Sequence, residues 1–461
     1  MNEPTTILAE INEYMKRREL TLTQLAKEAE INPGTLSSIL KGNRILTVEQ
    51  LDRITELMGG PKGHYYEAYL QEHLQEINPD WRRVYPLLNS CAELNKLDCF
   101  RKGIDLLLDN LFYAPLLFDL AEELFRKGKY EAAEILYENV ALSERRQHSE
   151  RLALCQYRLF TIRLGSNQFQ NVVLAYQFEP FVERLNEIDQ LDALKDLANI
   201  HRALHNWDKV EELTGMLRSK GEIQYHLAHR SNNKKNDSPS PGRPLFFYCA
   251  YADLLHASAS EAKKDYLVAL QYTYNYANLD WVIETDDDTQ QWVQLFKGWA
   301  QANTYAYTIL SGDAGILPKY IEYINANQDE ILPALFNIIE AANRYDFDVD
   351  DILQRFDTHI SDYIEQQHTI GFYTNQLIAN AFTEILHEIA CYYFGRYQFA
   401  LGFKYALHCL DFSFNLNKSG CILKSKAGLF EHHRDKASSE MKSAFQNLMD
   451  EKGKAVTMIG V

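Results

Sequence analysis

Residues 20–44 read LTLTQLAKEAEINPGTLSSILKGNR, and this stretch decides the fold of the first part of the chain. Thr21 is a suitable N-cap for a first short helix. Asn32 can cap a second helix, in which Pro33 suits the first position and Gly42 suits the end. The segment therefore predicts two short helices joined by a tight corner.

Amphipathic helices are also expected on both sides of this corner. Apolar residues recur at spacings of three and four over residues 7–18, 22–28 and 47–58. In the second helix of the corner, Leu36, Ile39 and Leu40 form the apolar stripe. The residues of that helix expected to point outward are Pro33, Gly34, Thr35, Ser38 and Lys41.

This arrangement resembles the Xre/Cro-type helix-turn-helix over about residues 7–58. In such domains the N-terminal residues of the second helix reach base edges in the major groove. The resemblance implies base contacts from Pro33, Gly34, Thr35 and Ser38, and phosphate contacts from Lys41, Asn43 and Arg44. The DNA-binding residues expected on this basis are Asn32, Pro33, Gly34, Thr35, Ser37, Ser38, Lys41, Asn43 and Arg44.

Two positions depart from the pattern of that family. Leu22 opens the first helix of the corner where the family often has Gln, and Glu30 occupies the turn position usually held by Gly. We expect Glu30 to adopt a left-handed or strained backbone, because a glycine normally supplies that conformation.

Charge limits the affinity of one copy for DNA. Residues 1–58 hold seven basic and nine acidic residues, although residues 32–44 contain Lys41 and Arg44 and no acid. Few phosphates can be neutralised, so a homodimer that reads two half-sites of a double-stranded operator is expected. The alternative is a helix-turn-helix-like bundle that contacts protein.

The rest of the chain is helical and repetitive. Residues 120–144 (LAEELFRKGKYEAAEILYENVALSE) follow the series of large, small and aromatic residues of a tetratricopeptide repeat. Phe169 follows Tyr130 by 39 residues and Trp207 follows Phe169 by 38. Weaker copies lie around Tyr266, Gly312 and Phe347, and a clean copy has Gly395 and Tyr397 in the Gly and aromatic positions.

The predicted fold is all-α, with a helix-turn-helix domain followed by a tetratricopeptide-like α-superhelix, or α-solenoid. We expect the helix-turn-helix domain at 1–62, the repeats at 63–419 and C-terminal capping helices at 420–461. Residues 229–244 (HRSNNKKNDSPSPGRP) contain no apolar residue and predict an exposed, mobile loop between hairpins.

Composition and motifs limit the class of function. The 461 residues carry a formal charge of -17, and the seven cysteines include no CxxC pair, which favours reduced thiols in the cytoplasm. No segment is apolar enough for a membrane helix, and no signal peptide is predicted. Phosphate-binding loops, HExxH and GxSxG motifs are absent, so we expect no enzyme activity, no cofactor and no metal site.

The repeats predict a groove for a ligand. Lys195, Asn199 and Arg202 share one helix face, where the carboxamide suits a peptide backbone and the cations suit a carboxylate. Corresponding positions in neighbouring hairpins are Tyr157, Thr161, Tyr251, Asn303, Tyr307 and Asn343. Each of these residues has the alternative of an ordinary solvated position or an ordinary contact between repeats.

The combination of both parts resembles the RRNPP group of peptide-sensing transcriptional regulators. The resemblance implies a cytoplasmic homodimer of the quorum-sensing type, whose repeats bind a short signalling oligopeptide that changes operator binding. Asparagines usually hold the peptide backbone in that group, which implies this role for Asn199, Asn303 and Asn343. Two alternatives stay open: the repeats bind a protein such as a response regulator, or they serve as a dimerisation scaffold for a constitutive regulator.

Overall fold

The computed structural model describes residues 6–74, 79–107, 110–145, 149–165, 167–230, 241–366, 376–415 and 420–458. These residues form helices and turns and no β-strand, which confirms the all-α prediction. The chain divides into two compact units, one made of residues 1–206 with 226–242 and the other of residues 207–225 with 243–461. Most of the loop predicted at 229–244, residues 231–240, lies outside the described residues.

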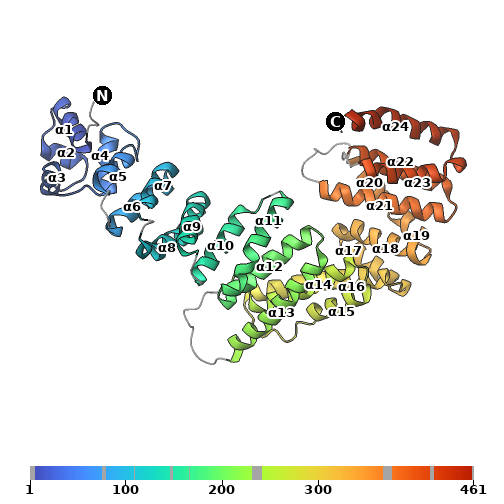
Figure 1. Cartoon of the computed structure of the whole chain (residues 1–461). Coiled ribbons are helices and arrows are strands. Elements are labelled where there is room, and N and C mark those ends of the chain that lie inside the picture. The colour runs from blue at the N-terminus through green and yellow to red at the C-terminus, as the bar shows by residue number, and fades with distance from the viewer. Residues whose placement is uncertain are drawn as a thin grey trace. The chain divides into compact units, whose positions relative to one another are not determined.

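Five short helices form the N-terminal part of the first unit (Figure 1). They are α1 (Ile7–Arg17), α2 (Leu22–Glu28), α3 (Pro33–Leu40), α4 (Val48–Leu57) and α5 (Tyr66–His73). Thr21 and Thr47 begin α2 and α4 with capping boxes, in which each threonine exchanges hydrogen bonds with a glutamine three residues on. The predicted stripe residues Leu36 and Ile39 are fully buried.

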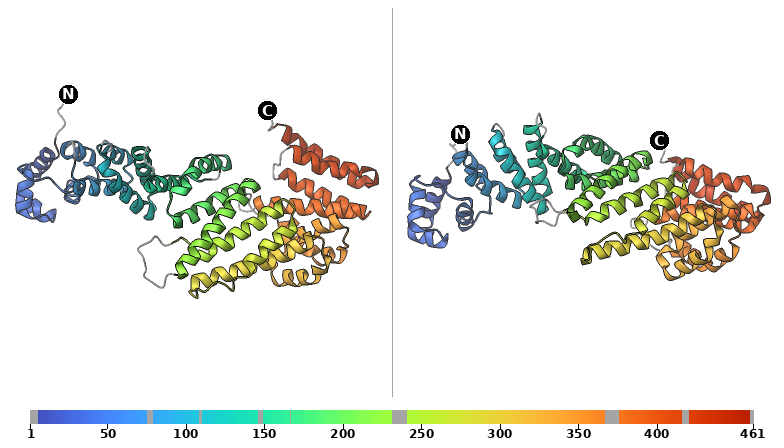
Figure 2. Two further views of the ribbon diagram at one scale, coloured as in Figure 1. Left: turned by 60° about the horizontal axis from the view of Figure 1, so that its bottom comes forward. Right: turned by 90° about the horizontal axis from the view of Figure 1, so that it is seen from below.

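Antiparallel helices continue the first unit, and most of them pack on the next helix in the chain (Figures 1 and 2). They are α6 (Trp81–Glu93), α7 (Leu97–Asp105), η1 (Leu111–Tyr113), α8 (Ala114–Arg126), α9 (Tyr130–Glu144), α10 (Glu150–Arg163), α11 (Gln168–Phe178), η2 (Glu179–Arg184) and α12 (Glu187–Ala203).

The second unit is built in the same way. Its helices begin within α13 (Trp207–Arg230) and continue with α14 (Leu245–Ala262), α15 (Tyr266–Ala277), α16 (Asp287–Leu310), η3 (Ala314–Ile316), α17 (Leu317–Ala326), η4 (Gln328–Glu330), α18 (Ile331–Tyr345), α19 (Asp350–Arg355), α20 (Asp357–Gln366), α21 (Gln376–Gly395), α22 (Phe399–Asn415), α23 (Gly420–His432), η5 (Arg434–Lys436) and α24 (Ser439–Met458). The last two α-helices both pack on α22. They also contact each other, since the ring of Phe430 on α23 stacks on the ring of Phe445 on α24 with centroids 4.2 Å apart.

A left-handed residue marks the corner of most helical hairpins. These corner residues are Asn95, Gly128, His205, Lys264, Gly312, Asp346 and Tyr397, with φ between 53° and 104°. Such a residue ends a helix and lets the chain reverse direction. The regular succession of hairpins is consistent with an α-solenoid.

The register of the last repeat differs from the prediction by two residues. Gly395 was expected in the corner position, but it is the last residue of α21, and Tyr397 has the positive φ of 60°. Phe399 therefore begins the second helix of this hairpin, as Tyr130 does in the hairpin of α8 and α9.

The first four helices and the helices after them share one core. The backbone N–H of Ile7 donates to Glu72 at 3.0 Å, and the hydroxyl of Tyr66 donates to Asp52 at 2.6 Å. Buried side chains form one hydrophobic cluster from Ile7 to Leu159. The helix-turn-helix part is therefore fixed to α5 and α6.

Candidate nucleic-acid interface and candidate binding groove

The helix α3, which the sequence predicts to read bases, is capped as expected. The side chain of Asn32 accepts hydrogen bonds from the backbone N–H groups of Gly34 at 2.9 Å and Thr35 at 3.3 Å. Pro33 occupies the first turn, and Gly42, two residues after the helix ends at Leu40, has a φ of 74°. Local chemistry therefore sets both ends of α3.

The outward face of α3 carries small polar side chains. Thr35, Ser37 and Ser38 are half-buried, whereas Pro33 and Gly34 are exposed. The hydroxyl groups of serine and threonine both donate and accept hydrogen bonds, so they can meet the edges of different bases. Small residues at this end also let the helix approach a groove closely.

The corner between α2 and α3 contains the left-handed glutamate expected from the sequence. Glu30 has a φ of 55°, and its carbonyl accepts a 3.2 Å hydrogen bond from the guanidinium of Arg53 in α4. The backbone N–H of Ile31 donates to the carbonyl of Ala26 at 2.8 Å. These bonds hold a conformation that costs a non-glycine residue about 1 kcal/mol or more.

Two predicted phosphate-binding residues, Lys41 and Arg44, are exposed at the end of α3. Neither forms an ion pair within the described part of the chain. Asn43 is also exposed, and its backbone N–H donates to the carbonyl of Ser38 at 2.9 Å. Of the nine predicted DNA-binding residues, Asn32 caps α3, and the other eight lie on α3 or on the loop that follows it.

Three of the predicted ligand-binding residues of the first unit already have partners on their own helix or on a neighbouring one. Tyr157 is buried, and its hydroxyl donates to Asp196 of α12 at 2.8 Å. Lys195 pairs with Asp192 at 2.8 Å and with Asp196 at 3.4 Å, and the hydroxyl of Thr161 donates to a carbonyl of its own helix. The other two members lie on α12, where Asn199 is half-buried and Arg202 is exposed.

Burial perturbs the carboxylates beside these residues. Desolvation raises the pKa of Asp196, although the positive charge of Lys195 opposes this shift. Burial also raises the pKa of Tyr157, so its hydroxyl stays protonated and acts as a donor. This cluster has the character of an internal network that joins α10 to α12.

Three of the four predicted residues of the second unit bond to neighbouring helices, and the fourth, Tyr251, contacts its own helix. The carboxamide of Asn303 donates to the hydroxyl of Tyr276 at 2.8 Å, and the hydroxyl of Tyr307 donates to Glu261 at 2.9 Å. Asn343 donates to the side chain of Glu388 at 2.7 Å. Tyr251 stacks on Phe247 with ring centroids 5.1 Å apart. No contact decides whether these residues bind a ligand, so their role stays a prediction.

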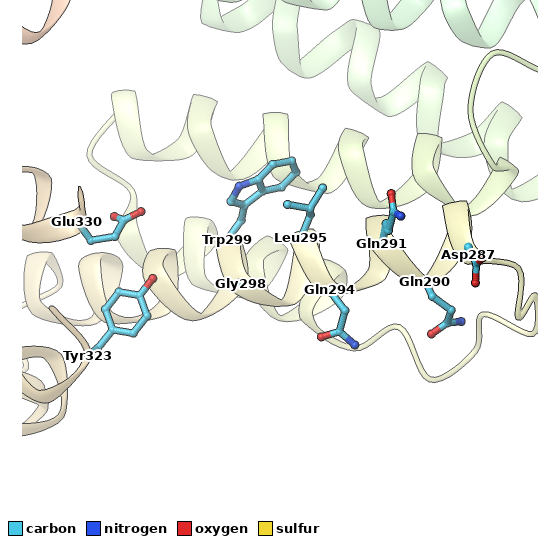
Figure 3. A pocket seen from close by; sticks show the side chains of 9 residues that line it. All are labelled: Asp287, Gln290, Gln291, Gln294, Leu295, Gly298, Trp299, Tyr323 and Glu330. Carbon is cyan, nitrogen blue, oxygen red and sulfur yellow. The ribbon is translucent and has the colours of Figure 1, made fainter. Parts of the chain in front are cut away.

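The structure contains a groove that sequence reasoning missed. It has a volume of about 840 Å³ and lies along the first half of α16 (Figure 3). The residues lining it are Asp287, Gln290, Gln291, Gln294, Leu295, Gly298, Trp299, Tyr323 and Glu330. A signal was present in the sequence, since no charged residue separates Asp288 from Lys297 and three glutamines fall in this interval.

The polar glutamines of this groove lie toward the start of α16, and the apolar Leu295 and Trp299 lie further along the helix (Figure 3). Trp299, Leu295 and Gln291 extend to one side of α16, whereas Gln290 and Gln294 extend to the other (Figure 3). Gly298 has no side chain and open space in front of it, so the helix backbone is accessible there. The large apolar side chains stay exposed, with 46% of Leu295 and 37% of Trp299 accessible to solvent.

The chemistry of the groove suits an extended peptide. A carboxamide donates and accepts, so it matches the donor and acceptor of a peptide unit. Trp299 and Leu295 offer an apolar contact, and Asp287 and Glu330 are acids near its two ends. Such a set favours a ligand that combines an apolar side chain with an amine.

The described residues hold no group of three or more His, Cys, Asp or Glu side chains with the geometry of a metal site. None of the helices in the described ranges has both the length and the apolar character that a membrane span requires. The candidate sites described above are the surface around α3 and the groove on α16.

Comparison with known proteins identifies the N-terminal segment. Residues 11–62 match the helix-turn-helix family, a segment that covers α2, α3 and α4 in full. No curated protein shows a significant match to the chain. The similarity over residues 11–62 supports a DNA-binding transcriptional regulator.

Proposed function

We propose that this regulator binds operator DNA through α3 and a short signalling oligopeptide through the groove on α16. The observation that carries the proposal is a capped reading helix with exposed or half-buried polar residues, in a chain that also holds a groove lined by three glutamines. The hydroxyls of Thr35 and Ser38 would meet base edges, and Lys41, Asn43 and Arg44 would contact phosphates.

Peptide recognition would rest on the backbone of the ligand. Gln290, Gln291 and Gln294 would hydrogen-bond its peptide units, while Trp299 would contact an apolar side chain. Acidic residues at the groove, Asp287 among them, would favour a free N-terminal amine. The proposal assigns the ligand to the groove on α16, whose side chains are mostly exposed, and not to side chains that already bond to a neighbouring helix.

The proposed regulator acts as a homodimer, because one copy offers few cations to DNA. A second copy requires a surface where two strongly acidic chains can approach. The helix α11 has no charged residue, and it exposes Phe169, Val173 and Tyr176 at spacings of four and three. Phe169 is 78% exposed, so most of its ring is available for contact with a second copy. We assign α11 to the contact with the second copy.

The dimer is tested by light scattering of the full chain. The double variant Phe169→Glu with Val173→Glu places two charges on α11 and should convert the dimer to a monomer. Leu142→Glu is the matched control, since Leu142 is 61% exposed on α9. A monomeric wild-type protein, or a variant that stays dimeric, would refute the role of α11.

Peptide binding would regulate by shifting the population of conformers that differ in operator affinity. Linkage then requires operator DNA to change peptide affinity by the same factor. The test is a pull-down of randomised short peptides with free N-termini on immobilised protein, followed by mass spectrometry. The same peptides with acetylated N-termini test whether binding requires the free amine, and we expect them to be captured less.

Gln294→Ala should reduce peptide capture at least about tenfold, the effect of losing one or two hydrogen bonds from a buried complex. Gln271→Ala provides the control, because Gln271 is exposed on α15 and does not line the groove. Equal capture by both variants would exclude the α16 groove as the peptide site.

A further inference from the structure

A second concave surface lies beside the end of the reading helix. It has a volume of about 700 Å³ and is formed by the loop after α3, the start of α4, α5 and the start of α6. Its lining residues are Gly42, Asn43, Arg44, Ile45, Leu46, Thr47, Val48, Glu49, Tyr69, Arg82, Arg83 and Pro86. Arg82 and Arg83 follow the segment that matches the helix-turn-helix family.

The floor of this surface is fixed by buried contacts. The hydroxyl of Tyr69 donates to the carbonyl of Leu46 at 2.7 Å, and both residues are buried. Asp52 accepts from the hydroxyl of Tyr66 at 2.6 Å and from the backbone N–H of Gly63 at 3.0 Å. The loop that carries Arg44 is thus held against the helices that lead to Arg82.

Three guanidinium groups line this surface, and all three residues are exposed. Arg44, Arg82 and Arg83 form no ion pair with any described residue. The acid that lines the surface, Glu49, is paired with Arg53 at 2.5 Å, so its charge is compensated. The surface is positive in a chain whose formal charge is -17.

Two other arginines of the first unit, Arg158 and Arg163, are used differently. Arg158 bonds to Glu122 at 3.0 Å between α8 and α10, and Arg163 bonds to Glu134 at 2.7 Å between α9 and α10. Those pairs hold neighbouring helices together. Arg82 and Arg83 lack such a partner among the described residues, although they belong to an acidic protein with many carboxylates.

We propose that Arg82 and Arg83, together with Arg44, bind the phosphate backbone of duplex DNA. The DNA-binding surface would then extend past the matched helix-turn-helix segment onto α6. This inference rests on the proposed function, because it places additional phosphate contacts beside the same reading helix. Guanidinium groups suit the role, since their planar N–H donors match the geometry of phosphate oxygens.

The proposal adds cations to a helix-turn-helix segment that has few of them, since residues 1–58 hold seven basic and nine acidic residues. Lys41 and Arg44 alone supply two cations at the end of α3, and Arg82 with Arg83 would double this number. Each neutralised phosphate changes the slope of log affinity against log salt concentration by about 0.9. Phosphate contacts carry no direct sequence information, so they would strengthen binding to every duplex.

The test measures binding of the full chain to a fluorescein-labelled duplex of mixed sequence, over a salt range of about 50 to 200 mM. Arg82→Gln with Arg83→Gln should weaken binding at low salt and reduce the salt slope by about 1.8 per bound copy. Arg82→Lys with Arg83→Lys keeps both charges and should retain most of the slope. Circular dichroism checks that each variant is folded.

The matched control removes two adjacent cations elsewhere in the same unit. Arg101→Gln with Lys102→Gln alters α7, and these residues do not line the surface. An unchanged slope in the Arg82 and Arg83 variant, or an equal loss in the control, would overturn the proposed phosphate site while leaving the role of α3 intact. Wild-type protein that does not bind duplex at all would contradict the proposed function itself.

Discussion

The hydroxyl of Tyr69 and the carbonyl oxygen of Leu46 form a buried hydrogen bond of 2.7 Å between α5 and the loop after the reading helix. Burial raises the pKa of Tyr69, so this hydroxyl remains a donor at neutral pH. The bond connects the helix-turn-helix segment to the helices that follow it. The position of Arg44 therefore depends on a residue outside the matched segment.

Tyr69→Phe should lower the free energy of unfolding by about 1 to 2 kcal/mol, because the carbonyl of Leu46 would be left buried without its partner. Denaturant unfolding measures this loss. Tyr130→Phe is the control: Tyr130 is 51% exposed, and its hydroxyl forms no hydrogen bond to a described residue. Equal stability of both variants would show that the Tyr69 bond contributes nothing.

Thr35→Ala with Ser38→Ala should abolish selective binding while the protein stays folded. Each lost base contact costs about 1 to 3 kcal/mol in discrimination. The cap of α3 is unaffected, because Asn32 bonds to the backbone N–H of Thr35 and not to its side chain. A gel shift with operator fragments recovered from genomic DNA measures the loss, and an unchanged shift would show that α3 does not read the bases.

Gly128→Ala and Gly215→Ala should change stability in opposite directions. Gly128 has a φ of 74° at the corner of α8 and α9, so alanine there is strained by about 1 kcal/mol although space is available. Gly215 lies inside α13 with open space around it, so alanine should stabilise that helix by up to about 1 kcal/mol. Thermal melting of both variants measures the sign of each change in melting temperature. Two changes of the same sign would contradict the role of Gly128 as a left-handed corner residue.

The sequence predicted the parts of the fold that local chemistry controls. The bounds of α2, its cap at Thr21 and the cap of α3 at Asn32 are all confirmed. These features depend on bonds across two or three residues. The corner of the last hairpin was predicted two residues too early. Glycine suits a corner, which favoured Gly395, but Gly395 is the last residue of α21 and the left-handed residue is Tyr397.

The sites were harder to predict because they depend on long-range contacts. Helix spacing selected Tyr157 and Tyr307 as ligand-binding residues, but it could not show that their hydroxyls bond to carboxylates 39 and 46 residues away. The approach of Arg82 to Arg44 is equally invisible in the sequence, since it requires the packing of α5 and α6 on α4.

The stability of the second unit should depend on the titration of Asp253. Burial raises the pKa of this carboxyl from an ordinary value of 3.8 to about 6, although the guanidinium of Arg218, which donates to it, opposes the shift. Between these two values the folded state holds a proton that the unfolded state lacks. The contribution of Asp253 to stability therefore falls as pH rises from about 4 to 6 and is constant above.

Asp253→Asn removes this titration. Relative to that variant, the wild type should gain roughly 2 kcal/mol of stability as pH falls from 7 to about 4. Denaturant unfolding at several pH values measures the difference, and Asp280→Asn, at an exposed position, serves as the control. A difference that does not change with pH would show that Asp253 titrates normally in the folded protein.

The most direct test of the central claim is genome-wide immunoprecipitation of the tagged protein in cells given medium from dilute or dense cultures. We expect discrete DNA peaks whose occupancy changes with dense-culture medium in the wild type and stays constant in Gln294→Ala. Discrete peaks that are indifferent to the medium in the wild type would contradict peptide sensing. The absence of discrete peaks in both media would contradict operator binding as well.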